Sequence, residues 1–335
     1  MLNYSNYVSL KTVLMKKILT FCVTTVLLLG VLFSTAPSCT RNDAYISESV
    51  QMDEAESSEA AFELLNAQLD DYDAAFLSAE ISLDKKKPGR IGFFKRLWLA
   101  LKVCLSDIIG GIGGLIAEGD WVAESSRLSA RAARSATVDM NRIQLSGIQI
   151  APVGELVLPA DNMLDSIGIR HNILIKAVYQ SDPEGFFICS DEELQRRFYQ
   201  QHDRLYGPVP REVVRAAPTL QARVDQVTNE VERLFWRHAN ENSSDEELIM
   251  HLKNALAVTA VRMPEYEKEL LVVMRYFETM VQLPEDQTIE VYTDGFRKII
   301  GNSDLPVGSI GKINSGISIA ANSNYLWQEV NSNNQ

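Results

Sequence analysis

The sequence predicts an all-α protein, a multi-helix bundle that follows a flexible N-terminal tether. Three observations support this class. The first two are that Ser190 and Ser244 are each followed three residues later by a glutamate, which is the pattern of a capping box that starts a helix. A third is the spacing of apolar residues by alternating threes and fours, which puts them on one helix face. One short middle segment, residues 147–160, is extended or looped, because its prolines and glycines exclude a helix.

The chain begins with the pattern of a secretory signal. Two lysines at positions 16 and 17 precede an apolar run from Ile18 to Phe33, and small residues then lead to Cys39. This succession is typical of a bacterial lipoprotein signal, here residues 1–38, whose translation start is Met1 or Met15. We expect Cys39 to be acylated, with palmitate among its chains, because two or more chains hold a protein firmly on a membrane.

Two alternatives to lipidation stay open from the sequence. The apolar run approaches the ~20 residues that span a bilayer, so a retained anchor is one alternative. Cleavage after Ala36 is the other, although Pro37 would then obstruct the ordinary signal peptidase. Thr40 follows the cysteine in place of the aspartate that is associated with inner-membrane retention. We therefore expect a lipoprotein of the cell envelope, in the outer membrane, on its periplasmic or its surface face.

Charge excludes one class of partner. Removal of residues 1–38 takes away three lysines and no acid, so the formal charge moves from −12 to −15. An acidic chain lacks the basic face that nucleic-acid binding requires. The cysteines left besides Cys39 are Cys104 and Cys189, and their pairing stays open. Cys104 lies in an apolar helical stretch, where a free thiol acts as a small hydrophobe.

The N-terminal part of the mature chain combines a tether with a helix. Residues 39–58 are polar and acidic, which predicts a disordered tether, and residues 59–330 form the helical domain. A helix over about 54–83 carries a heptad seam. With only three heptads, this seam packs along its own bundle rather than forming a coiled-coil oligomer. The seam residues are Phe62, Leu65, Leu69, Tyr72, Phe76, Ala79 and Leu83.

A basic and aromatic segment follows a break at residues 85–90. Residues 91–109 predict a helix that is apolar on most sides, ended by the glycines at 110–114. We favour a core helix. The alternative is contact with a membrane surface, and with it a membrane-active, bacteriocin-like effector that uses residues 91–116. The candidate membrane-contact residues are Phe93, Phe94, Lys95, Trp98 and Lys102.

The second half of the chain predicts a series of further helices. Arg127, Arg131 and Arg134 lie on one side of the first of them, and the stretch from Asn302 to Trp327 is ambiguous because it is rich in Gly and Ser. The expected helices cover about 120–140, 162–180, 190–206, a segment after Pro218, 244–262, 264–283 and 285–300.

Motifs for chemistry are scarce. The chain has no His-Glu-x-x-His, Cys-x-x-Cys or Gly-x-Ser-x-Gly, so we expect no metal, no cofactor and no catalytic residues. His171 and Asn172 are the most informative polar pair, because Gly168 in the same helix indicates a bend or a close contact. We interpret them as a buried pair that fixes helix register. A binding site, and a hydrolase near His171, are the alternatives.

Three features resemble those of uncharacterised exported proteins of Bacteroidota-type bacteria: the aromatic and lysine-containing helix from about residue 92 that ends in residues 107–114, residues 167–172, and residues 319–327. The resemblance implies export and a helical body, and it supplies no activity. We therefore expect an envelope lipoprotein, attached to the membrane through lipid, whose helical body binds a protein or peptide partner without catalysis.

Overall fold

The computed structural model describes residues 46–82, 97, 100–114, 121–142, 148–154, 165–239, 243–283 and 286–331. The chain divides into two units, Met1–Glu54 and Ala55–Gln335, and of the first unit only the start of one helix is described. The described residues of the second unit, which contains the core, form helices and one two-stranded sheet. The predicted all-α class is therefore confirmed.

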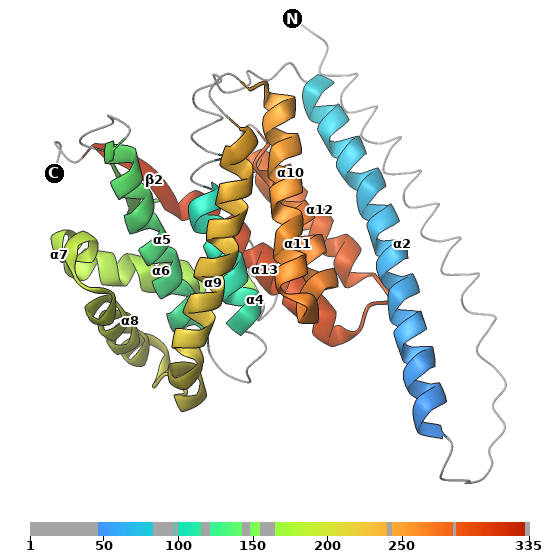
Figure 1. Ribbon diagram of the computed structural model, residues 1–335, viewed down its shortest axis with the longest axis horizontal. Helices are drawn as coiled ribbons and strands as arrows, with labels where there is room; N and C mark the ends of the chain where they lie inside the picture. The colour runs from blue at the N-terminus through green and yellow to red at the C-terminus, as the bar shows by residue number, and fades with distance from the viewer. Residues whose placement is uncertain are drawn as a thin grey trace, which may run out of the picture. The chain divides into compact units, whose positions relative to one another are not determined.

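Figure 1 shows the order of the elements along the chain. A π-helical turn, η1 (Ala100–Cys104), leads into α4, and a 3-10 turn, η2 (Pro264–Tyr266), leads into α11. The α-helices are α2 (Ile46–Ser82), α4 (Leu105–Gly114), α5 (Val122–Arg142), α6 (Asp165–Ser181), α7 (Pro183–Ile188), α8 (Asp191–Tyr206), α9 (Arg211–His238), α10 (Asp245–Arg262), α11 (Glu267–Met280), α12 (Asp286–Gly301) and α13 (Val307–Leu326).

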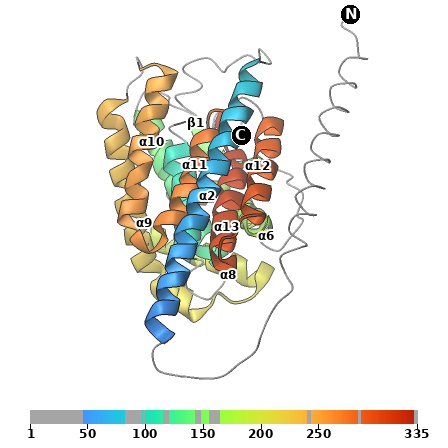
Figure 2. The same ribbon diagram turned by 90° about the vertical axis from the view of Figure 1, so that its right-hand side faces the viewer.

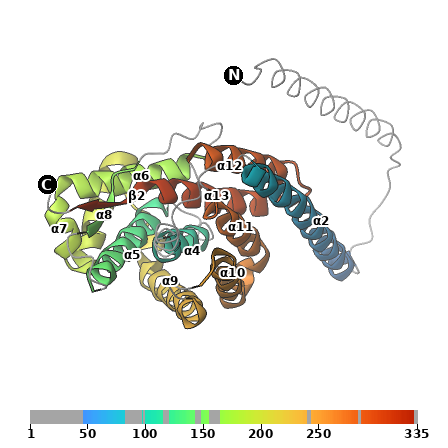
Figure 3. The ribbon, with the colours of Figure 1, turned by 90° about the horizontal axis from the view of Figure 1, so that it is seen from above.

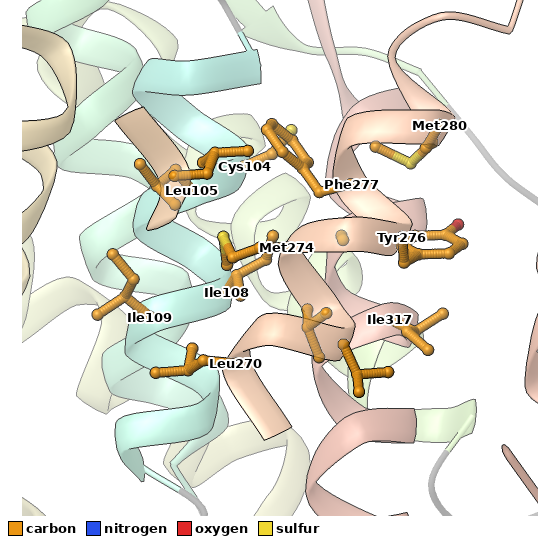
Figure 4. Close-up of a cluster of buried hydrophobic side chains, with 14 of the residues drawn as sticks. Cys104, Leu105, Ile108, Ile109, Leu270, Met274, Tyr276, Phe277, Met280 and Ile317 are labelled. Carbon is orange, nitrogen blue, oxygen red and sulfur yellow. The ribbon is translucent and has the colours of Figure 1, made fainter. Parts of the chain in front are cut away.

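Helix α4 lies at the centre, with α5, α9 and α13 around it (Figure 3). Apolar side chains of η1 and α4 face those of α11, where Cys104 of η1 and Ile108 of α4 lie near Met274 and Phe277 (Figure 4). Every one of these side chains is almost fully buried. Residues 100–111 therefore form a core helix, as the sequence analysis favours over membrane contact, and the burial of this apolar surface stabilises the bundle.

Helix α4 continues through Gly110 and Gly111, and its described part ends at Gly114, within the glycine run that the sequence predicts as its end. A Cβ on Gly110 would lie 3.2 Å from the side chain of Leu128, and one on Gly111 would lie 2.4 Å from that of Ile319. The glycines thus let α5 and α13 approach α4 closely. Tertiary packing outweighs the low helix propensity of glycine here.

A second hydrophobic core joins α5, α6, α7 and α8 to the sheet. Strand β1 (Ile148–Pro152) pairs antiparallel with β2 (Trp327–Asn331), with Ile150 opposite Glu329. The extended segment expected within residues 147–160 is confirmed over β1. Its partner β2 begins at Trp327, where the ambiguous stretch ends.

Helix α2 packs on α11 and α12 through the seam that the sequence predicts (Figure 2). Phe62, Leu65 and Leu69 are buried in the first core. Tyr72 stacks on Tyr292 of α12, with ring centroids 5.5 Å apart. The seam therefore packs within its own chain, in agreement with the interpretation preferred for it.

Arg275 of α11 fixes α2 further through ionic contacts. Its guanidinium lies 2.6 Å from Asp73 and 2.7 Å from Asp70, and it donates to the carbonyl of Asn66 at 3.1 Å. Asp73 also accepts a hydrogen bond of 2.7 Å from the Tyr292 hydroxyl. One arginine thus contacts three positions of α2.

Several helix boundaries test the predicted start signals. Ser244 and Glu247 form a complete capping box, and α10 ends at Arg262 as expected. The Ser190 side chain likewise accepts from the amide of Glu193 at the start of α8. These two starts are local features of the sequence, and both are confirmed.

Other boundaries differ from expectation. Helix α9 begins at Arg211 and contains Pro218. The proline removes one backbone hydrogen bond, and a long packed helix tolerates this loss. Helix α2 begins at Ile46, so residues 46–58, assigned to the tether, belong to its first turns. That segment contains three glutamates together with Gln51, Met52 and Ala55, residues that favour helix. The short α7 was not predicted.

The signal, residues 1–38, and Cys39 lie outside the described residues, as do Phe93, Phe94, Lys95 and Trp98 of the candidate membrane segment. Within the ranges that the structure describes, no helix has both the length and the hydropathy needed to cross a membrane.

Candidate functional site

The residues that the sequence singles out on α6 lie against α13. A Cβ on Gly168 would lie 2.5 Å from both the Ser318 carbonyl oxygen and Nδ2 of Asn322. Asn172 donates to the backbone carbonyl of Asn322 at 2.9 Å. Gly168 is therefore required by the close approach of two helices, one of the two explanations that the sequence suggests for it.

His171 is fully buried and faces Asp107 of α4. Asn172 uses its amide nitrogen for α13, so its Oδ1, 3.1 Å away, accepts from Nδ1 of His171. Nε2 of His171 lies 3.8 Å from Oδ1 of the Asp107 carboxylate, without a hydrogen bond between them. The pair is in contact but is not hydrogen-bonded.

The other oxygen of Asp107 is fully engaged. Oδ2 accepts hydrogen bonds from Ser129 of α5, at 3.0 Å, and from Ser323 of α13. The indole of Trp327 in turn donates to Ser129 at 2.9 Å. Residues of α4, α5, α6, α13 and β2 thus meet in one polar cluster, which we call the Asp107 cluster.

The Asp107 cluster has no access for a substrate. The side chains of Asp107, His171, Ser129 and Ser323 each have essentially no exposed surface. Buried polar groups of this kind must find partners within the protein, and here most of them do. The geometry supports the interpretation that His171 and Asn172 hold helices in register.

An open cleft lies elsewhere, between α5 and α9. Its cavity volume is about 370 Å³, within the range of small-molecule and peptide side-chain sites. Helix α5 contributes Arg131, Arg134 and Ser135, positions that share one helix face because they are three or four apart. Helix α9 contributes Asp225, Asn229 and Glu232 with the same kind of spacing. We call this feature the α5–α9 cleft.

Charges of both signs line the α5–α9 cleft. Arg131 lies 2.8 Å from Asp191, at the start of α8, and also pairs with Asp225 across the cleft. Lys102 of η1 lies 3.0 Å from Glu232. Burial of the Arg131 guanidinium opposes protonation, but the hydrogen bonds that it donates to Asp225 and Asp191 outweigh this effect and raise its pKa. The lining contains three basic and three acidic side chains, so its formal charge is zero.

A buried ion pair one helical turn before Arg131 connects α5 to its neighbours. Arg127 and Glu124, both on α5 and both buried, are joined at 3.0 Å. Arg127 also donates to Gln221 of α9 at 2.7 Å, and the hydroxyl of Tyr199 of α8 donates to Glu124 at 3.1 Å. Burial and then the negative charge of Glu124 raise the pKa of Tyr199. Helices α5, α8 and α9 are thus connected next to the cleft.

Lys102 is the described member of the candidate membrane-contact set. It is mostly buried in the α5–α9 cleft and paired with Glu232, on the side of η1 that faces α9. Its charge is therefore used inside the bundle. The remaining four members lie in parts of the chain that the structure does not describe.

The arginine stripe of α5 can be recognised from the sequence, but the cleft cannot. Arg131 and Arg134 are recognisable from helical spacing, whereas Asp225 and Glu232 are more than ninety residues away in the sequence. No local pattern joins the two stripes. A basic stripe on an acidic chain is the one signal that points to this place.

Neither location forms a metal or thiol centre. In the ranges that the structure describes, no group of three or more His, Cys, Asp and Glu side chains is arranged to hold a metal ion. Cys104 and Cys189 are free thiols. Burial, and then the charge of Asp107, raise the pKa of Cys104 to about 12, so this thiol is unreactive near neutral pH.

Comparison of the chain with protein-family models, curated proteins and solved structures finds no match. The residues and their arrangement are therefore the only basis for a proposed function.

Proposed function

We propose that this protein is an exported cell-envelope lipoprotein whose helical body binds a protein or peptide partner in the α5–α9 cleft. The observation that carries the binding role is the cleft itself, open to solvent and lined by charged side chains on two connected helices. The proposal of export rests on the signal that ends before Cys39.

The residues on the cleft walls suit recognition more than structure. Ser135 and Asn229 are exposed, and Val138, also on the α5 wall, is 50% exposed. Exposed ion pairs such as Arg131–Asp191 stabilise a fold by only about 0–1 kcal/mol each. Their partners can therefore be exchanged for those of a bound chain at little cost to the fold.

Two features favour binding over catalysis. The imidazole of His171, the candidate for a hydrolase, is closed off in the Asp107 cluster. The α5–α9 cleft contains no histidine or cysteine among its lining residues, and its carboxylates are paired with lysine or arginine. Neither place offers an accessible nucleophile next to a general base.

Photo-crosslinking in the living cell tests the binding role. A photoreactive amino acid at Ser135, an exposed position of the cleft, is expected to capture a defined protein partner in the envelope. The matched control is Val291 of α12, which is 64% exposed and belongs to neither wall. Equal capture at both positions, or none at Ser135, would contradict the proposal.

Fractionation tests the lipid anchor separately. Cys39→Ser is expected to move the protein from the membrane to the soluble periplasmic or secreted fraction, since the lipid is the proposed attachment. A variant that stays on the membrane, together with a mature N-terminus other than residue 39, would refute lipidation.

A further inference from the structure

The α5–α9 cleft separates charge by wall. The α5 wall presents Arg131 and Arg134, whereas the α9 wall presents Asp225 and Glu232. At the floor, Lys102 adds one positive charge, and at the entrance Asp191 adds one negative charge. A chain that enters between α5 and α9 thus meets cations on one side and anions on the other.

The pairs that link the walls are open to exchange. The side chains of Arg131 and Asp225 are each about one-third exposed, so solvent and ligand groups can reach both. Ser135 and Asn229 add one exposed polar group to each wall, and neither side chain is hydrogen-bonded within the described part of the chain. These groups are available to a ligand without loss of an internal contact.

We propose that the cleft selects a peptide segment that carries both acidic and basic side chains. This inference rests on the proposed function and adds the chemical class of the bound segment. An acidic side chain of the ligand would pair with Arg131, and a basic one with Asp225. The cross-cleft ion pair of these two residues is then replaced by two pairs with the ligand, and the mostly buried Lys102–Glu232 pair stays in place.

Ligands of one sign are disfavoured by the same arrangement. An all-acidic peptide satisfies the α5 wall but brings like charges against Asp225 and Glu232, and an all-basic one does the reverse against Arg131 and Arg134. A neutral peptide gains neither set of pairs. Charge complementarity with both walls therefore sets the selectivity, and added salt weakens it.

Binding of defined peptides to the purified full chain in detergent tests this class. The probes are fluorescent peptides of equal length, built on a Gly/Ser backbone with Glu and Lys, with Glu only, with Lys only, or with neither. We expect the mixed peptide to bind at least about fivefold more tightly than the others, the effect of one exposed ion pair. Free glutamate and lysine at the same concentration are expected not to compete.

Two variants test the walls without loss of a native contact. Ser135→Glu puts an acid on the basic wall, and Asn229→Lys puts a base on the acidic wall. Each is expected to weaken binding of the mixed peptide about fivefold, whereas Val291→Glu leaves it unchanged. Circular dichroism of all three variants verifies that the fold is retained.

Each outcome has a definite meaning. Preference for the Glu-only or Lys-only peptide, equal binding of all four, or no binding of any would overturn the ligand class. Competition by the free amino acids would show that a small zwitterion, and not a peptide, is bound. The photo-crosslink at Ser135 judges the binding role independently, so a partner captured there without selectivity for mixed peptides would refute only this inference.

Discussion

Replacement of Gly168 by alanine is expected to destabilise the protein, although alanine is the better helix former. A Cβ at this position would lie 2.5 Å from the Ser318 carbonyl oxygen and 2.5 Å from Nδ2 of Asn322. Contacts this short force α6 away from α13, and overpacking of this kind costs about 1–3 kcal/mol. Displacement of Asn322 would also weaken its hydrogen bond to the Ser318 carbonyl, worth about 1 kcal/mol.

The opposing gain is about 1 kcal/mol of helix propensity, so the net loss is about 1–3 kcal/mol. Gly311 of α13 is the matched control, because a Cβ there meets nothing within 4 Å. Gly311→Ala is expected to stabilise the protein by up to about 1 kcal/mol. Denaturant unfolding followed by circular dichroism measures both changes. A Gly168→Ala protein as stable as the parent would refute the close approach of α6 and α13.

Three further predictions concern single side chains. His171→Ala should lower the free energy of unfolding by about 1–3 kcal/mol, because Asn172 loses its partner in a buried site, and an unchanged unfolding midpoint would contradict the structural role. In the native protein a thiol reagent should modify Cys189 and not Cys104, which is 3% exposed, as mass spectrometry would show; modification of both at similar rates would refute the packing of α4. Hydrogen bonds from two arginines of α8 lower the pKa of Glu193 from 4.5 to about 2, so its stabilising effect is present above pH 4.5 and is lost as the pH falls towards 2. Glu193→Gln should accordingly flatten the acid limb of the unfolding profile in that window, and a profile with an unchanged slope would show that this carboxylate has no such effect.

Local signals predicted the starts of helices well. Ser244 begins α10 through a capping box that involves only four consecutive residues, and the heptad seam of α2 needs only its own spacing. Such features depend on neighbours in the sequence, so they can be read without the fold. The all-α class follows from them.

Signals that depend on tertiary contact were missed or misread. Helix α13 is rich in Gly and Ser, and it is helical because its small side chains pack against α4, α6 and α11. The glycines at 110–114 include the last residue of α4, but the close approach of α5 and α13 at Gly110 and Gly111 was not predicted. Propensity is a weak guide where packing decides.

The Asp107 cluster and the α5–α9 cleft show the same difference between local signals and signals that depend on tertiary contact. The burial of His171 and Asn172 was expected from their apolar helix and is confirmed. Their partner Asp107, and the pairing of the α5 arginines with Asp225, depend on how distant helices fold together. Neither could be inferred from spacing along one chain.

Occupancy of the α5–α9 cleft in the cell envelope, the proposed location of the protein, tests the central claim most directly. Ser135→Cys in a Cys189→Ser background puts one accessible thiol on the cleft wall, and Val291→Cys in the same background is the control. The measurement is the rate of modification by a thiol reagent in isolated envelopes, divided by the rate for the purified protein. A bound partner predicts a ratio well below one at position 135 and a ratio near one at position 291. Equal ratios at the two positions would contradict the proposal that the cleft binds a partner.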